Sequence, residues 1–248
     1  MIDTIYADGS VQAKNQDRFF LGMSGLLLLI LLVGFSRTLY LRLFFEVPAI
    51  PGYLHLHGAT VTAWFVLLVV QASLVNVRRV DIHRRLGILG AVLGVAVIPA
   101  GLMATLQFIP RLPEIGLPFE VAPRVVTWIV FANFHMLLGF VVFLAAALLN
   151  RRKTDFHKRL MLLATISLIP PALARISQNI GWVLEQEIIF VTVTWLLLVV
   201  PILTYDLVAT KRLHSATARG GLFFLLVVFG PILISGTDFA QNFVRGLG

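Results

Sequence analysis

The sequence predicts an all-α integral membrane protein with about seven transmembrane helices. Its 248 residues are 58% hydrophobic and only 13% charged, with a mean hydropathy of +0.92, whereas roughly a quarter of the residues in soluble domains are charged. A membrane-spanning helix needs about 20 apolar residues. Seven such runs and their short connections occupy nearly the whole chain, so we expect one transmembrane domain over residues 1–248 and no separate soluble catalytic domain.

Each expected span is apolar nearly all round rather than along one face, as helices exposed to lipid must be. No small-residue cleavage pattern follows the first apolar run, so we expect it to be a retained span rather than a secretory signal. The predicted spans cover residues 19–40, 54–76, 86–108, 125–149, 159–183, 187–208 and 221–243.

The distribution of basic residues predicts the orientation. If the N-terminus is cytoplasmic, fourteen of the twenty Lys and Arg residues fall on that side, five fall on the other, and Arg175 lies inside span five. This bias follows the positive-inside rule and predicts a multi-pass protein of the bacterial inner (cytoplasmic) membrane. The net charge of +8 therefore reflects topology and contact with lipid headgroups, and we do not expect nucleic acid as a partner.

The chain contains no cysteine. Iron–sulfur clusters, thiolate–zinc sites, covalently attached c-type haem and cysteine nucleophiles are therefore excluded. Any metal or cofactor must be held by histidine, methionine, carboxylate or backbone groups.

Two basic loops share a pattern. Residues 76–87 and 150–161 each run from Asn through a basic cluster, Asp, an apolar residue and His to a basic pair and Leu. In both cases an apolar run with a histidine near its outer end precedes the loop. This similarity predicts a parallel repeat of two-helix units, spans two–three and four–five, that together form a central four-helix bundle.

The four histidines of this repeat are predicted to lie at two depths. His57 and His83 are 26 residues apart, and His135 and His157 are 22 apart. Helical rise converts these separations to about 39 and 33 Å, enough for each pair to straddle the bilayer. His57 and His135 are expected near the outer side, and His83 and His157 near the cytoplasmic side.

This layout resembles the four-histidine, two-haem transmembrane cytochromes, which include ascorbate-dependent ferric reductases. The resemblance covers roughly residues 54–183 and implies two b-type haems held by the four histidines, which would also be the metal ligands. The His-basic-Arg-Leu motif also resembles that of haem A synthase and of small proteins that assist cytochrome oxidase assembly. As a whole, the chain is similar to uncharacterised bacterial membrane proteins that carry the same His-Arg/Lys-Arg-Leu loops.

Two interpretations of the inner histidines stay open. His83 and His157 lie in basic, loop-like sequence, where Asp81 and Asp155 can each cap the following helix while the histidine meets lipid headgroups. The alternative is haem ligation, which usually places the ligands inside helices.

The outer histidines belong to polar and aromatic stripes. His57, Trp64 and Gln71 are spaced by seven, which brings them onto one helix face within about 40°. Polar groups in hydrocarbon usually turn inward, so this face is expected to line a haem, quinone or metal pocket, or to act as packing between helices. We expect His57 and His135 to face one another, although His135 lies about one turn deeper.

Arg175 lies inside expected span five, away from the basic loops. It shares a helix face with His157, and Pro170 and Pro171 below it are expected to kink that span. We expect Arg175 to be buried and paired with a haem propionate, a lipid phosphate or Asp238, the alternative being a side chain that extends to the outer interface. Two further polar residues, Asp206 and His214, are interpreted as interfacial and solvent-exposed and are left out of the candidate site.

Three functions follow from these residues. The first is a b-type haem redox protein that passes electrons across or within the bilayer, with a quinone as a second candidate cofactor. The alternative is a non-enzymatic accessory or assembly subunit of a respiratory or photosynthetic complex, partnered by other membrane subunits. The third, a small-molecule or lipid transporter, is disfavoured because carboxylates are nearly absent from the spans.

Overall fold

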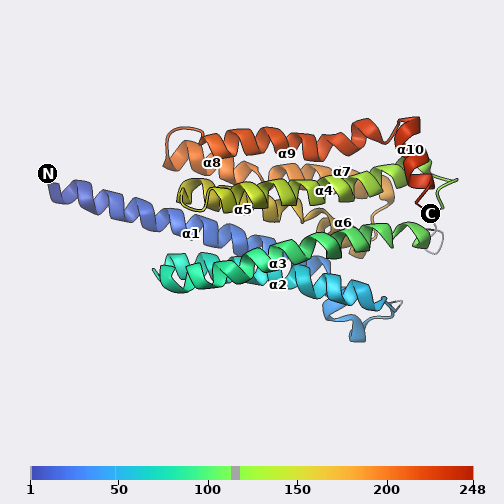
Figure 1. The fold of residues 1–248 in the computed structure, drawn as a ribbon, viewed down its shortest axis with the longest axis horizontal. Helices are drawn as coiled ribbons and strands as arrows, with labels where there is room; N and C mark the ends of the chain where they lie inside the picture. Colours follow the sequence, from blue (N-terminus) through green and yellow to red (C-terminus); the bar gives the residue numbers. More distant parts are fainter. Residues whose placement is uncertain (1, 48, 113–117, 248) are drawn as a thin grey trace.

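The computed structural model describes residues 2–47, 49–112 and 118–247, with side chains from residue 18 onward. The described residues form helices and connections without a β-strand, which confirms the all-α prediction. Figure 1 shows the helices running roughly parallel to one long axis, with α1 extending beyond the others at its N-terminal end. The helices are α1 Ile2–Gly34, α2 Gly52–Asn76, α3 Val80–Leu106, α4 Pro123–Leu149, α5 Thr154–Ser167, α6 Pro170–Asn179, α7 Leu184–Leu197, α8 Val200–Ala209, α9 Ser215–Ile234 and α10 Asp238–Arg245, with short turns at Ser36–Tyr40, Arg42–Phe44 and Ile109–Arg111.

Several of these helices can cross a membrane. Five helical segments within the described residues are long and apolar enough: α2, α3 with its following turn, α4, α7 with α8, and α9. The α5–α6 pair makes a sixth if it counts as one bent span. The described apolar part of α1, Arg18–Gly34, is shorter. A polytopic membrane protein is therefore supported.

Span five is kinked, as its two consecutive prolines predicted. The chain bends by 42° between α5 and α6, because Pro170 and Pro171 lack the N–H groups that would continue the hydrogen-bond ladder. Because of this bend, His157 and Arg175 do not lie on the one continuous helix face that the sequence had predicted.

Two other boundaries also differ. The first helix ends at Gly34, and a π-helical turn, Ser36–Tyr40, follows it. The last long helix ends at Ile234 because Thr237 starts a new one, its Oγ1 accepting a hydrogen bond from the Ala240 N–H at 3.3 Å.

The two predicted helix hairpins exist, but α1 shares the core with them. α2 packs on α3, α4 packs on α5, and α1 packs against α2, α5 and α6, while α9 covers α4 and α5. Buried side chains of α1, such as Leu27 and Leu31, join the main hydrophobic cluster. α1 therefore contributes to the core beside the two hairpins, whereas the sequence predicted it only as a first span.

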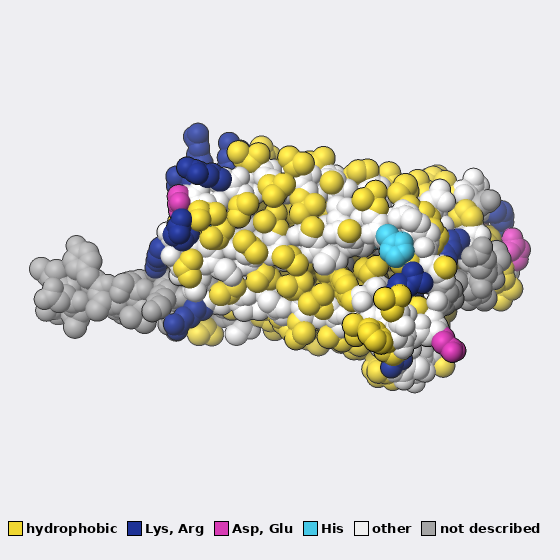
Figure 2. Space-filling view, turned by 90° about the horizontal axis from the view of Figure 1, so that it is seen from below, with side chains coloured by type: hydrophobic (Ala, Val, Ile, Leu, Met, Phe, Trp, Pro, Cys, Tyr) yellow, Lys and Arg dark blue, Asp and Glu magenta, His cyan; other side chains and the backbone are white. Residues whose placement is uncertain are grey.

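The charged residues lie at the ends of the molecule. The α2–α3, α4–α5 and α8–α9 connections lie together at the end from which α1 projects (Figure 1). Figure 2 shows Lys and Arg side chains gathered at that end and hydrophobic side chains over the long flank between the two ends. Large exposed apolar side chains such as Ile88 (73%) and Leu149 (85%) belong to these helices. In water this surface would be unfavourable, whereas lipid matches it.

Candidate functional site

A groove of about 490 Å³ lies toward the basic end of the bundle. Residues of α1, α2, α3, α4 and α5 line it, so its walls come from both halves of the predicted repeat. Four of the seven predicted site residues meet here: His83, His157, Trp64 and Gln71.

The two inner histidines reach the groove in equivalent ways. The Nδ1 atom of His83, in the first turn of α3, hydrogen-bonds the Gln71 carbonyl of α2 at 3.4 Å. The Nδ1 atom of His157, in the first turn of α5, hydrogen-bonds the Ala147 carbonyl of α4 at 2.9 Å. Both imidazoles are half-buried. Each hairpin therefore presents its first-turn histidine to the carboxyl-terminal part of the helix before it.

These contacts determine which nitrogen of each ring can bind a ligand. A carbonyl oxygen only accepts hydrogen bonds, so in the neutral ring Nδ1 carries the proton and Nε2 carries the lone pair. A metal-ligating histidine commonly donates its other ring N–H to such a carbonyl, which orients the ring and raises its basicity. His83 and His157 thus have the hydrogen bonding of metal ligands.

Trp64 forms the inner wall of the groove. Its indole is 2% exposed, donates Nε1–H to the Thr165 hydroxyl at 3.2 Å and packs edge-on against Phe140 at 5.1 Å. About two turns further along α2, Gln71 keeps its Oε1 atom buried without a hydrogen-bond partner among the described residues. Such an unsatisfied acceptor is unfavourable, so a ligand or a water in the groove would stabilise it.

Glycines keep the opposite wall open. A Cβ at Gly87 would have only the Gln71 amide nitrogen near it, at 3.9 Å, and a Cβ at Gly90 would be 3.5 Å from Leu67, an ordinary contact. At Gly94, one turn deeper, a Cβ would lie 2.7 Å from Leu144 and 3.0 Å from Trp64. Gly94 therefore permits close helix packing, whereas Gly87 and Gly90 leave space in the groove.

The mouth of the groove is charged. Lys158 forms an ion pair with Asp155 at 2.6 Å and lies over the Phe20 ring at 5.1 Å. Arg78 and Thr154 also line this end. The groove is therefore amphipathic, with apolar walls and cationic side chains at the mouth near the basic end of the molecule.

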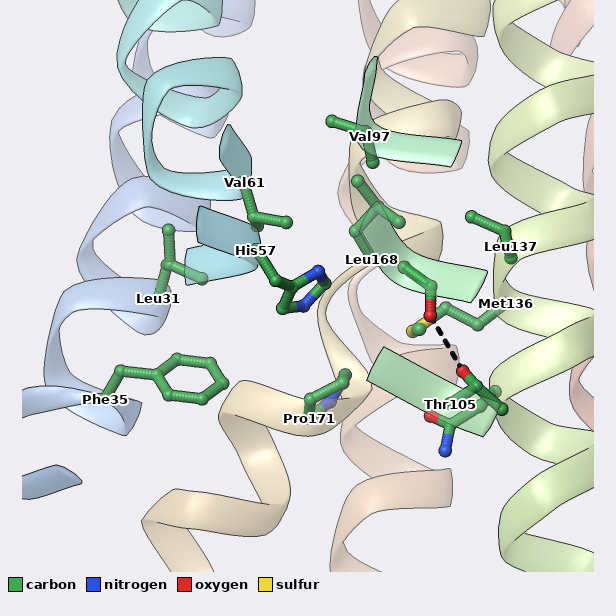
Figure 3. A pocket seen from close by; sticks show the side chains of 12 residues that line it. Leu31, Phe35, His57, Val61, Val97, Thr105, Met136, Leu137, Leu168 and Pro171 are labelled. Atoms are coloured by element: carbon green, nitrogen blue, oxygen red, sulfur yellow. Dashed lines mark hydrogen bonds between the residues drawn. The ribbon is translucent and has the colours of Figure 1, made fainter. Parts of the chain in front are cut away.

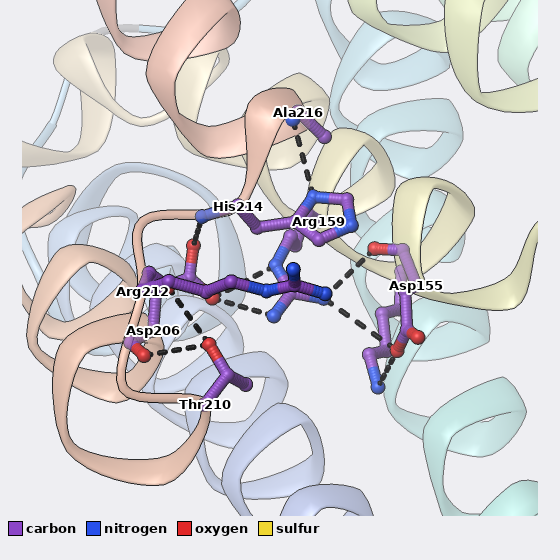
Figure 4. A network of polar contacts seen from close by, with 8 residues as sticks. Asp155, Arg159, Asp206, Thr210, Arg212, His214 and Ala216 are labelled. Carbon is purple, nitrogen blue, oxygen red and sulfur yellow. Dashed lines mark hydrogen bonds and ion pairs between the residues drawn. The ribbon is translucent and has the colours of Figure 1, made fainter.

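A buried ion pair lies next to this mouth, and the sequence analysis missed it. Arg159 is 1% exposed and Asp206 is fully buried. Arg159 donates from Nε at 2.9 Å and from Nη2 at 2.5 Å to the same Asp206 oxygen, and from Nη1 to the Asp155 carbonyl at 2.9 Å. Figure 4 shows the guanidinium between the two acidic residues. Asp206 is therefore buried, and its interpretation as an interfacial residue is wrong. A single carboxylate within an apolar run could have indicated a buried ion pair.

His214 belongs to the same network rather than to solvent. Its backbone N–H donates to Asp206 Oδ2 at 3.1 Å, and its Nδ1 accepts from the Ala216 N–H, so the side chain caps α9. The ring is half-buried and packs against Phe156. Burial and the Arg159 guanidinium lower the pKa of His214. The expectation of a solvent-exposed residue is therefore wrong.

The outer histidines do not meet. His57 lines a small cavity of about 40 Å³ together with Asn133 and Met136 of α4. His135 lies two residues after Asn133, about 200° around the helix. It hydrogen-bonds the Phe131 carbonyl at 2.8 Å and packs against Gly230 of α9. The prediction that His57 and His135 face one another is wrong, because they lie on opposite faces of α4.

Arg175 is exposed rather than buried. Its Nη1 donates to Gln178 at 2.9 Å, and the Gln178 amide donates to both carboxylate oxygens of Glu187 at 3.1 Å. This chain joins α6 to the first turn of α7. Among the described residues the partner of Arg175 is therefore Gln178 rather than Asp238, and Arg175 lies away from the groove.

A scan of protein-family models, a search of curated proteins and a search of solved structures each gave no match. A functional assignment therefore depends on the residues of this chain.

The groove fits a ligand that needs two imidazoles. The described residues contain no cluster of three or more His, Cys, Asp or Glu side chains that would hold a metal ion alone. Two axial imidazoles suffice for a haem, because the macrocycle supplies the other four ligands. The volume of the groove also lies within the range of cofactor pockets, roughly 300–1,000 Å³.

Proposed function

We propose that this protein is a membrane redox protein that binds one b-type haem in the groove, with His83 and His157 as axial ligands. The observation that carries the proposal is that both histidines line one groove while their Nδ1 atoms hydrogen-bond backbone carbonyls, which leaves both Nε2 lone pairs free to bind iron. A bound haem would supply one-electron transfer between a donor and an acceptor.

The other groove residues have matching roles in this proposal. Lys158 and Arg78 lie at the mouth, where they would neutralise the two carboxylates of the haem. Trp64, Gly87 and Gly90 provide flat or open walls for a planar ring. The apolar lining excludes water from the ring faces and would thereby tune the reduction potential.

The geometry supports one haem rather than two. The outer cavity is about 40 Å³, and the side chains of His57 and His135 lie on opposite faces of α4. We therefore propose electron transfer within the inner half of the membrane, between a cytoplasmic or quinol donor and an acceptor not yet identified, rather than through two stacked haems.

The test is the absorption spectrum of the full-length protein purified in detergent and incubated with haem. We expect a Soret band that shifts on reduction at one haem per chain. His83→Ala and His157→Ala should each abolish the six-coordinate spectrum, while the exposed His55→Ala control keeps it. Unchanged spectra in both variants would refute these ligands. Haem bound well below one per chain would instead favour the accessory or assembly role.

We also propose that the chain crosses the inner membrane seven times with its N-terminus in the cytoplasm. The supporting observation is that three basic connections lie together at the end from which α1 projects (Figure 1). Reporter fusions after Lys153 and after Pro118 should then report cytoplasm and periplasm, respectively. Signals from the same compartment would contradict this topology.

A further inference from the structure

The small outer cavity around His57 is separate from the haem groove, and none of its lining residues lines the groove. Figure 3 shows His57 entering it from α2 and Met136 from α4. Its volume of about 40 Å³ is too small for a haem, a quinone or a lipid, since even one water needs roughly 10–15 Å³ measured in this way. Its occupant is therefore a single ion or a few waters.

One nitrogen of His57 lacks a partner. The His57 Nδ1 atom is buried without a hydrogen-bond partner among the described residues. In the tautomer that carries the proton on Nε2, Nδ1 has the lone pair of a metal ligand.

The other donors in the cavity are soft or neutral. The Met136 thioether is a weak hydrogen-bond acceptor but a good ligand for soft metals, and Asn133 adds a neutral amide. No carboxylate is present among the lining residues, so the cavity lacks the ligands that calcium and magnesium require. Without a counter-charge, a monovalent ion is also less costly to bury than a divalent one.

We propose that this cavity is a site for one copper(I) ion, held by His57 Nδ1 and Met136 Sδ with Asn133 as a third donor. Thioether and imidazole together select copper(I) among the metals available to cells. No redox step is involved, because the ion is bound in its reduced state. The site is independent of the haem proposal, since the two sets of lining residues do not overlap.

The probe is copper(I) titrated anaerobically into the full-length protein in detergent, in competition with a chromogenic copper(I) chelator. We expect one copper(I) per chain, with nitrogen and sulfur scatterers in its X-ray absorption spectrum. Met136→Leu, which conserves volume, should weaken binding at least tenfold and remove the sulfur scatterer. Met103→Leu, at a 37% exposed methionine of α3, is the matched control and should bind as the parent does.

A second variant, His57→Gln, keeps a polar group in the cavity and should also lose the ion, while haem binding in the groove stays unchanged. Copper(I) should raise the melting temperature of the parent protein but not of Met136→Leu, because a ligand that binds only the folded state stabilises it. Equal copper affinity in the parent and Met136→Leu, or no copper bound by the parent, would overturn the proposal and leave a hydrated cavity.

Discussion

Replacing Arg159 with alanine is expected to lower the free energy of unfolding by about 3–5 kcal/mol, because it leaves the Asp206 carboxylate buried without its partner. Both residues are almost fully buried, and two guanidinium nitrogens contact one carboxylate oxygen. The loss should appear as a large decrease in melting temperature in detergent. Asp206→Asn should also be destabilising because it removes the buried carboxylate that faces Arg159 and leaves the more exposed Asp155 as its anionic partner.

Two controls separate this pair from general charge effects. Arg152→Ala removes an exposed arginine of the same loop and should change stability by no more than about 0.5 kcal/mol. The double variant Arg159→Met, Asp206→Leu removes both charges and should recover most of the loss, since a buried ion pair can often be replaced by apolar side chains. If Arg159→Ala behaves like Arg152→Ala, the pair does not form.

Replacing Gly90 with leucine is expected to abolish haem binding while the fold is retained. The new side chain would project into the groove. Its Cβ would lie 3.5 Å from Leu67, which is an ordinary van der Waals contact, so the helix can accept it without a clash. Leucine also favours a helix by about 1 kcal/mol over glycine. The Soret band should therefore disappear while the melting temperature of the haem-free protein stays equal or rises.

The matched control is Gly22→Leu on α1. That glycine is exposed, has nothing within 4 Å of a built Cβ and lies outside the groove. This variant should bind haem as the parent does. Haem binding retained by Gly90→Leu would mean that any bound haem lies elsewhere, whatever the histidine variants show.

The features that the sequence predicted correctly depend on composition and on neighbouring residues of one helix hairpin. Apolar length and the absence of charged helix faces indicated the membrane as solvent, and among the described residues five or six helices are long and apolar enough to span it. The repeated loop pattern placed His83 and His157 at equivalent helix starts. Both line one groove for a local reason, since each hairpin turns directly after the helix whose carbonyl its histidine contacts.

Contacts between distant helices could not be read in this way. Arg159 and Asp206 are 47 residues apart and meet only because α5 and α8 pack at the same end of the molecule. The sequence therefore predicted Asp206 at the end of span six and Arg159 at the start of span five without pairing them. His135 was assigned to the wrong neighbour because an apolar helix offers no polar face that shows which side meets which partner.

The sequence by itself determined the solvent of this protein, its helical class, the common end of its basic loops and the histidines worth testing, because composition and periodicity respond to lipid and to local helix geometry. Tertiary structure alone decided that α1 joins the core, that Arg175 pairs through Gln178 with Glu187, and that His57 has a cavity of its own. These features depend on which helix faces meet, and in a chain that is apolar all round, that choice is made by side-chain packing between helices.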